Sequence, residues 1–155
     1  MNYQEISSSA SSISSVMLPS QANPSGNVHG GEIMKLMDTA ASVTAIRHCK
    51  KNVVTLRVDE LIFHEPIYVG NLVTVNSRIS YVGLTSMEIK VEVWVEDIEK
   101  KNSCHLTQSA YFTFVALNKD KKPVKVPKII PSTPDEIKLF KEGEKRYLKR
   151  KKSKK

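Results

Sequence analysis

The sequence predicts an α+β fold in which an antiparallel sheet packs against one long helix. Residues 31–49 show the three-and-four spacing of apolar residues that is typical of a helix with one buried stripe. Four segments with strand character follow between residues 53 and 117, without an intervening helix. Consecutive strands of this kind favour antiparallel pairing. We therefore expect the order strand, helix and four strands, followed by an accessory helix.

Residues 1–12 form a Ser-rich segment, and a short strand around residues 15–18 is expected after it. The long helix should begin at Gly30 or Gly31 and end near Cys49. Its buried stripe consists of apolar or small residues: Ile33, Leu36, Met37, Ala40, Val43 and Thr44.

The four strands that follow differ in the clarity of their patterns. Residues 53–63 are rich in β-branched residues, and residues 72–82 follow a Gly70-Asn71 turn. Apolar and polar residues alternate along residues 86–97, which predicts a strand with one apolar and one polar face. Residues 106–117 alternate less cleanly and form a hairpin with the preceding strand.

The composition changes after residue 118, and this change divides the chain. Residues 13–118 contain the predicted sheet and long helix, whereas residues 119–155 form a basic extension that begins with a Pro-containing connector. Within the extension, Pro134 follows Thr133 at a favourable helix start. We expect an accessory helix there that runs to about Arg150.

Composition limits the class of protein. A chain of 155 residues with 40% hydrophobic content suits one domain. No apolar run is long enough to span a membrane and no secretion signal is recognisable, so we expect a cytoplasmic protein. Cys49 and Cys104 lack metal-ligand or redox spacing and are expected to be free thiols, and the four histidines show no ligand pattern, so no metal is expected.

The net charge of +8 is concentrated in the extension. Residues 1–118 hold 9 basic and 11 acidic side chains, whereas residues 119–155 hold 15 and 5. Such a tail suits the phosphates of nucleic acid, lipid or a nucleotide-bearing substrate. The alternative is a solvated terminus, which the absence of aromatic residues in residues 151–155 favours.

The segment around the start of the long helix holds the clearest chemical signal. Asn23, the two glycines Gly30 and Gly31, and Asp38 combine an amide, a helix N-terminus with unpaired N–H groups and a carboxylate. This set predicts chemistry on a carbonyl, with Asp38 as base or nucleophile. The alternative is a solvated Asp38 paired with Lys35 three residues earlier.

Five motifs then occur in order along the chain. They are Asn23-x-x-Gly26-x-x-His29-Gly30-Gly31, Asp38, Phe63-His64-Glu65-Pro66, Gly70 and Val82-Gly83-Leu84-Thr85-Ser86-Met87. With them, residues 13–118 resemble the hotdog-fold acyl-CoA thioesterases, specifically the acyl-CoA hydrolase family that includes YciA-like enzymes and brain acyl-CoA hydrolase.

This resemblance implies a hotdog fold, in which the sheet wraps around the long helix and two subunits form one continuous sheet. It also implies a homodimer as the minimal active unit, with hexamers, as trimers of dimers, common in the family. Asp38 would be the general base or nucleophile, and Asn23 of the facing subunit would orient water or the thioester. The N–H of Gly30 or Gly31 would polarise the carbonyl, and His29 would shape the helix entry.

The resemblance also implies substrate-binding residues. Gly83, Thr85 and Ser86 would hold the pantetheine arm, although the same residues suit a simple hairpin turn. Phe63 and Pro66 would line the acyl or pantetheine channel, although an aromatic at a strand end is more often part of a core. For the phosphates of coenzyme A, the candidate basic residues are Arg57, Arg78, Lys90 and those after residue 118, among which the sequence does not choose.

The expected function is therefore hydrolysis of acyl-CoA to free fatty acid and coenzyme A. No cofactor is expected, because coenzyme A is part of the substrate and product. Hydration of an acyl thioester, which other hotdog proteins perform, usually uses a histidine where this chain has Asp38. The alternative of a different class is a non-catalytic acyl-CoA-binding or nucleic-acid-binding protein that uses the basic tail.

Overall fold

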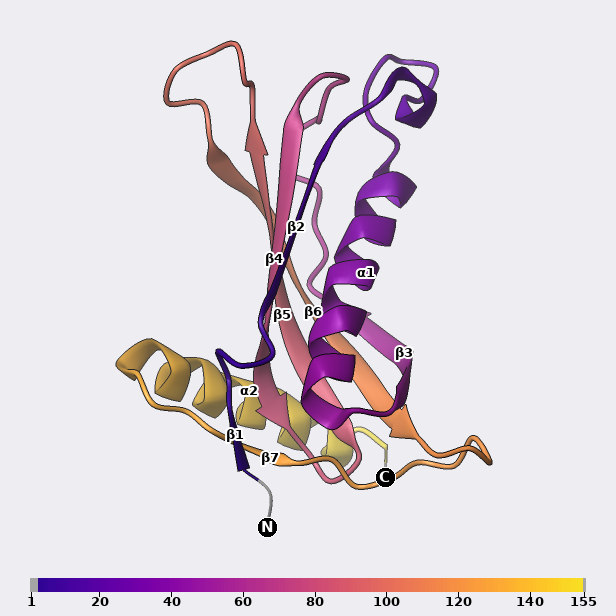
Figure 1. Cartoon of the computed structure of the whole chain (residues 1–155), viewed down its shortest axis with the longest axis vertical. Helices are drawn as coiled ribbons and strands as arrows, with labels where there is room; N and C mark the ends of the chain where they lie inside the picture. The colour runs from indigo at the N-terminus through magenta and orange to yellow at the C-terminus, as the bar shows by residue number, and fades with distance from the viewer. Residues whose placement is uncertain (1–2, 155) are drawn as a thin grey trace.

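The structure, a computed structural model, describes residues 3–154; residues 1, 2 and 155, at the ends of the predicted Ser-rich and basic segments, lie outside the described residues. Five antiparallel strands form a sheet in the order β2-β4-β5-β6-β3 (Figure 1). The inner face of this sheet packs on the long helix α1, and helix α2 covers part of the outer face. The predicted α+β class, with one long helix against an antiparallel sheet and a C-terminal accessory helix, is confirmed.

Helix α1 spans Gly30–Cys49, as predicted. The ring of His29 caps its first turn, and the helix ends at Lys50, whose φ of 54° is left-handed. The predicted stripe faces the sheet, and its fully buried members include Ile33, Met37, Ala40 and Thr44. Burial of this stripe, more than helix propensity, stabilises α1.

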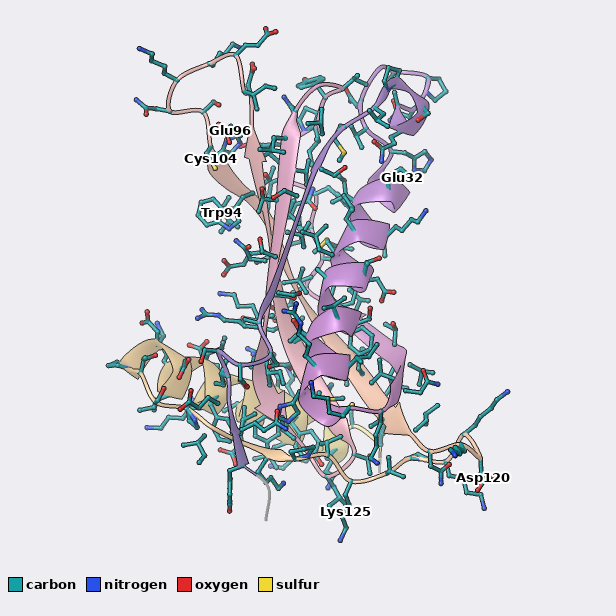
Figure 2. All side chains as sticks on the ribbon, in the orientation of Figure 1. Glu32, Trp94, Glu96, Cys104, Asp120 and Lys125 are labelled. Carbon is teal, nitrogen blue, oxygen red and sulfur yellow. The ribbon has the colours of Figure 1, made fainter. Side chains whose placement is uncertain are left out.

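The three central strands match their predicted bounds to within one residue. They are β4 (Leu72–Val82), β5 (Ser86–Glu96) and β6 (His105–Leu117). On β5 the odd-numbered residues from Met87 to Val95 belong to the core that packs on α1. Trp94 points the other way, away from α1 (Figure 2).

The first edge strand, β2, lies at Ser11–Val16, four residues earlier than its predicted start at Ser15. Its pairing with β4 uses hydroxyl groups as well as the backbone, because Ser11 Oγ lies 2.7 Å from Ser77 Oγ. A strand stabilised by cross-strand hydroxyl pairs carries little hydrophobic alternation to mark its start in the sequence.

The other edge strand, β3, spans Asn52–Asp59 and is shorter than predicted, since it was expected to reach Phe63. Glu60 adopts a left-handed φ of 60°, which ends the strand, and a loop follows. Along β3 the side chains of Val54 and Leu56 are 42% and 58% exposed. In this protomer β3 pairs only with β6, so its second edge and these apolar groups face outward.

A small parallel pair, not predicted from the sequence, joins the start of the described chain to the segment before α2. Strand β1 (Tyr3–Glu5) pairs with β7 (Lys128–Ile130), which lies in the predicted connector. A short 3₁₀ helix, η1 (Pro19–Gln21), precedes α1.

Helix α2 spans Pro134–Lys152, two residues beyond its predicted end. Thr133 and Glu136 form a capping box at its start. The helix approaches the sheet closely at Gly143, where a Cβ would lie 2.7 Å from Tyr81 Cβ. The glycine is therefore required for the observed packing.

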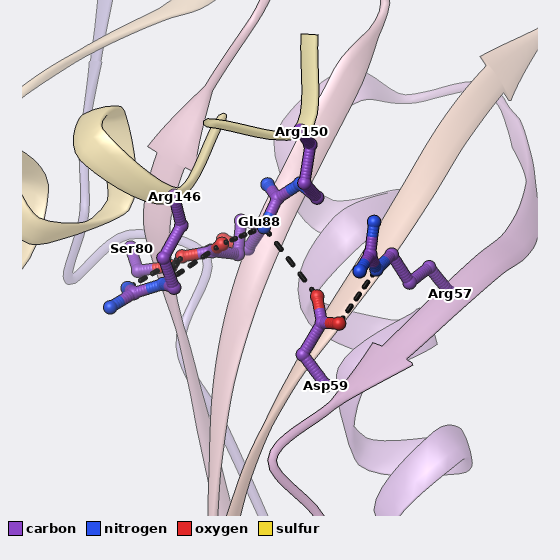
Figure 3. Close-up of polar contacts among 6 residues, drawn as sticks. All are labelled: Arg57, Asp59, Ser80, Glu88, Arg146 and Arg150. Atoms are coloured by element: carbon purple, nitrogen blue, oxygen red, sulfur yellow. Dashed lines mark hydrogen bonds and ion pairs between the residues drawn. The ribbon is translucent and has the colours of Figure 1, made fainter. Parts of the chain in front are cut away.

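A buried carboxylate on β5 connects the sheet to α2 (Figure 3). Glu88 is 2% exposed and accepts hydrogen bonds from Arg146 at 2.8 Å, from Arg150 at 3.1 Å and from the Ser80 hydroxyl at 2.6 Å. Arg150 also reaches Asp59 on β3 at 3.5 Å. Because a buried charge is tolerated only when it is paired, these contacts fix where α2 docks.

Candidate active site

Asp38 lies in the middle of α1, half-buried, and faces β3. Its Oδ1 accepts a 2.7 Å hydrogen bond from the Thr55 hydroxyl. The alternative partner, Lys35, forms no ion pair with Asp38 among residues 3–154. The carboxylate is thus oriented by a neutral donor from the neighbouring strand, and Oδ2 keeps its lone pairs for other contacts.

Asn23 lies in the turn before α1. Its Oδ1 accepts the backbone N–H groups of Ser25 at 3.0 Å and Asn27 at 3.2 Å, which is an Asx turn. This turn fixes the side chain through its carbonyl end. Within residues 3–154 the NH₂ group of Asn23 makes no hydrogen bond, so both of its donors remain for a ligand.

The two glycines at the helix start have different partners. The Gly31 N–H donates to His29 Nδ1 at 3.2 Å, which agrees with the expected role of His29 at the helix entry. The Gly30 N–H has no partner in the described part of the chain. Of the two predicted donors, Gly30 is therefore the one that can bind an oxygen at the positive end of the helix dipole.

A cleft of about 280 Å³ brings four of the predicted site residues together: Asn23, Gly30, Phe63 and Pro66. The Phe63 ring packs over Gly30, 3.5 Å from where a Cβ would stand. At its rim Glu65 pairs with His105 at 2.8 Å, and the Ser103 carbonyl together with Glu65 raises the pKa of His105.

Neither Asp38 nor Gly31 lines this cleft. Asp38 is two helical turns from Gly30, on the part of α1 that faces β3. Within one chain the candidate residues thus form two separate groups, called half-sites below: the cleft at the helix start, and the Asp38 carboxylate with Thr55. Sequence reasoning missed Thr55, because a threonine in a strand is common and only the packing of β3 on α1 places its hydroxyl on Asp38.

The predicted pantetheine residues lie in a third place, at the turn between β4 and β5. The Gly83 N–H donates to the Ser86 carbonyl at 2.8 Å, which closes the turn. The Tyr147 ring of α2 packs on Gly83, where a Cβ would lie 2.9 Å from the ring. Thr85 and Ser86 line an adjoining pocket of about 460 Å³.

This pocket is basic. Besides Thr85 and Ser86 it is lined by Arg57 from β3 and by Arg150, Lys151 and Lys154 from the extension. The other two candidates, Arg78 and Lys90, lie elsewhere, in a pocket beside β2. The end of the basic tail, which the sequence allowed as a solvated terminus, thus forms one wall of a pocket.

Two other properties of the described residues bear on function. Among residues 3–154 no group of three or more His, Cys, Asp or Glu side chains could hold a metal ion, and Cys49 and Cys104 are free thiols. No described helix has the length and apolar character needed to cross a membrane.

The sequence is similar to those of several known proteins. The model of the Thioesterase superfamily matches residues 25–101. The cytosolic acyl coenzyme A thioester hydrolase of Rattus norvegicus is 42% identical over 147 residues, which are 94% of this chain but 39% of the rat protein. The chain therefore spans well under half of that relative. Protein VdlD of Helicobacter pylori is 43% identical over 128 residues, 83% of this chain and 72% of its own.

Solved structures are similar over nearly the whole chain. A hexameric acyl-CoA thioesterase, crystallised in its apo form, gives a TM-score of 0.92 at 28% identity and covers 99% of this chain and 97% of its own. The acyl-CoA hydrolase of Staphylococcus aureus, in complex with butyryl coenzyme A and coenzyme A, gives a TM-score of 0.89 at 30% identity. The match covers 98% of this chain and 92% of the staphylococcal chain. Three variants of the staphylococcal enzyme, in which one aspartate, asparagine or threonine is changed to alanine, are also similar. Their TM-scores are 0.89, 0.87 and 0.84, respectively, at 28–29% identity. The matches cover at least 98% of this chain and at least 93% of each variant chain.

Proposed function

The chain belongs to the Thioesterase superfamily and has its hotdog fold, and we propose that it hydrolyses acyl-CoA to a free acid and coenzyme A in the cytoplasm. One observation carries the proposal. The Thr55 hydroxyl holds the Asp38 carboxylate at 2.7 Å, and the free amide donors of Asn23 lie at the helix start. The cytosolic rat relative supports the compartment.

The spacing of these three residues supports their role. In the staphylococcal enzyme the asparagine, aspartate and threonine changed to alanine stand 15 and 17 residues apart. Asn23, Asp38 and Thr55 have the same separations here. We assign them as the polar groups of one active site.

A dimer joins the two half-sites. The outward edge of β3, with the exposed side chains of Val54 and Leu56, suits pairing with β3 of a second copy into one continuous sheet. In this arrangement Asn23 of one subunit faces Asp38 of the other. We take the homodimer as the minimal active unit and a hexamer, as a trimer of dimers, as the assembly, in line with the hexameric structural neighbours.

The chemistry follows from the positions of the donors. The Gly30 N–H, aided by the helix dipole, polarises the thioester carbonyl and stabilises the developing oxyanion. Asp38 either removes a proton from the attacking water or attacks the carbonyl itself, and both routes require this carboxylate beside the reacting carbon. The Asn23 NH₂ orients the water or the thioester. The reaction needs no metal or cofactor, because coenzyme A enters as part of the substrate and leaves as product.

The basic pocket is proposed to receive coenzyme A. Thr85 and Ser86 offer hydroxyl and backbone groups to the pantetheine arm, while Gly83 keeps the turn close to α2. Among the basic residues, the pocket favours Arg57 and Arg150, with the lysines of the tail, for the phosphates. Phe63 and Pro66 belong to the channel at the other half-site.

The test is thiol release from short, medium and long acyl-CoAs, measured with a thiol-reactive dye. Asp38→Asn keeps the shape but removes the base, so turnover should vanish while affinity for acyl-CoA changes little. Lys35→Gln, one turn away on α1, is the matched control and should keep the wild-type rate. Full activity in Asp38→Asn would exclude the mechanism. Binding without turnover in wild type would indicate an acyl-CoA-binding protein instead, and binding to nucleic acid that survives Asp38→Asn would indicate the basic tail as the functional element.

A further inference from the structure

Gln108 on β6 is a buried polar side chain without a partner. It is 2% exposed and points to the inner face of the sheet, like Ala110 and Phe112. Within residues 3–154 neither Nε2 nor Oε1 forms a hydrogen bond. Buried amides are nearly always paired, and leaving both ends unpaired costs stability. The packing of the fold thus gives no reason for an amide here, where a leucine or methionine would fit the surroundings.

The position of Gln108 suggests the reason. It lines the cleft at the start of α1 together with Asn23, Gly30 and Phe63. Of the other polar side chains there, Asn23 Oδ1 closes its Asx turn and Glu65 pairs with His105. The Asn23 NH₂ group and the side chains of Asn27 and His64 are less buried than Gln108. Among the residues that line the cleft, Gln108 alone has buried polar atoms without a partner in the described chain.

The chemistry of the cleft selects which part of the substrate enters. No lysine or arginine of residues 3–154 lines it, and the Glu65 carboxylate at its rim is paired with His105, so the cleft lacks the basic side chains that line the other proposed pocket. The apolar side chains of Val28, Ile33 and Ile67 form part of its wall. Given the proposed function, on which this inference rests, the cleft takes the thioester carbonyl at Gly30 and the uncharged acyl group beside it.

We propose that Gln108 is a specificity-determining residue that hydrogen-bonds an oxygen on the acyl group. A plain hydrocarbon chain would displace water and leave the amide unpaired. A short acyl group with a hydroxyl or keto oxygen satisfies it, because Nε2 donates to that oxygen and Oε1 accepts from a hydroxyl. The cleft therefore favours short oxygenated acyl groups, such as 3-hydroxyacyl and 3-oxoacyl, over saturated groups of the same length.

The experiment compares 3-hydroxybutyryl-CoA, as each enantiomer, and acetoacetyl-CoA with butyryl-CoA. Wild type should show the higher kcat/KM on at least one of the oxygenated substrates. Gln108→Met keeps an unbranched chain of similar length without hydrogen bonding, and it should lower the ratio of that kcat/KM to the value for butyryl-CoA by about five- to tenfold, the scale of one lost hydrogen bond. Ser109→Ala, the next residue on β6 but exposed on the other face, should leave the ratio unchanged.

Two results would overturn the inference: a wild-type preference for butyryl-CoA over all three oxygenated substrates, or a ratio that Gln108→Met leaves unchanged. The substrate preference of wild type is measured without a variant, so it tests the inference even if Gln108→Met fails to fold. The proposed function fails separately, when wild type releases no thiol from any acyl-CoA or when Asp38→Asn stays active. Hydrolysis that depends on Asp38 but not on Gln108 would leave that function intact.

Discussion

The Thr55 hydroxyl donates to Asp38 Oδ1 at 2.7 Å and so ties an edge strand to the middle of the long helix. The bond fixes which carboxylate oxygen remains free for water or the thioester. It also couples the candidate site to the position of β3, the strand proposed to join two subunits.

Replacing Thr55 by valine should therefore slow turnover. Valine keeps the β-branched shape and removes only the hydroxyl, so we expect kcat to fall by roughly ten- to a hundredfold, the scale of a lost orienting hydrogen bond, with little change in KM. Thr55→Ser, which keeps the hydroxyl, should retain most of the activity. Steady-state thiol release measures both, and equal rates for the two variants would contradict the assigned role.

Asn23→Ala should lower kcat on the order of a hundredfold, because it removes a donor that acts on the water or the thioester. The variant also loses the Asx turn that the Asn23 carbonyl forms, so a matched Asn23→Asp variant is needed. Asp keeps the acceptor of the turn and lacks the NH₂ donors. Both variants should be slow. If Asn23→Asp keeps the wild-type rate, the turn is what matters.

Glu88→Gln should weaken the docking of α2. The buried carboxylate accepts from two arginines, and removing its charge leaves Arg146 without a carboxylate partner and Arg150 with only the longer contact to Asp59. We expect the free energy of unfolding to fall by about 2–3 kcal/mol, less than for a fully buried pair because both arginines can regain water. Glu92→Gln changes a carboxylate on the same face of β5 that, within residues 3–154, is paired with the partly exposed Lys90 alone. It should lower the free energy of unfolding by under about 1 kcal/mol. Urea denaturation compares the two, and similar losses would argue against the network.

Acidification should destabilise the fold through His48. This side chain is fully buried and its Nε2–H donates to the Pro127 carbonyl at 2.8 Å. Burial lowers the pKa of His48 below 6.5, although the bond to Pro127 opposes the shift. Between the lowered pKa and 6.5 the unfolded chain binds a proton that the folded chain does not, so the free energy of unfolding falls as pH decreases through this window.

One proton limits this effect to about 1.4 kcal/mol per pH unit. His48→Gln keeps a donor for Pro127 but does not titrate. In this variant the free energy of unfolding, measured by urea denaturation, should decline less between about pH 7 and pH 5 than in wild type. His64→Gln, an exposed histidine, should leave the decline as it is. An unchanged slope in His48→Gln would assign the pH dependence to other groups.

Local patterns were sufficient for most of the fold. Helix α1 and strand β5 have strong periodicity, and their predicted bounds match the structure to within one residue because the same residues form the buried core. The bounds of β4 and β6 were predicted from the turns that precede them. The edges were harder. Strand β2 pairs through serine and threonine hydroxyls, and β3 ends at a left-handed Glu60, and neither feature has a hydrophobic period.

For the candidate site, Asn23 and Gly30 were predicted from their place at the helix start, whereas Phe63 and Pro66 were predicted from the resemblance to a known family. Asn23, Gly30, Phe63 and Pro66 lie close in sequence to the helix start or its covering loop, and the structure gathers them in one cleft. Contacts between distant segments were out of reach: Thr55 against Asp38, Gln108 against the cleft, and the tail lysines against Thr85 and Ser86. Only the tertiary packing of strands and helices creates these neighbours.

The pairing of Glu88 with Arg146 and Arg150 has a consequence for synthesis of the chain. The ribosome makes β5 well before it makes α2, so a nascent sheet carries a carboxylate whose partners do not yet exist. Until residues 134–152 emerge, that carboxylate must stay hydrated, and the outer face of the sheet beside Tyr81 stays uncovered. The outer layer of the fold can therefore form only after α2 has left the ribosome, although the sheet and α1 precede it in the chain.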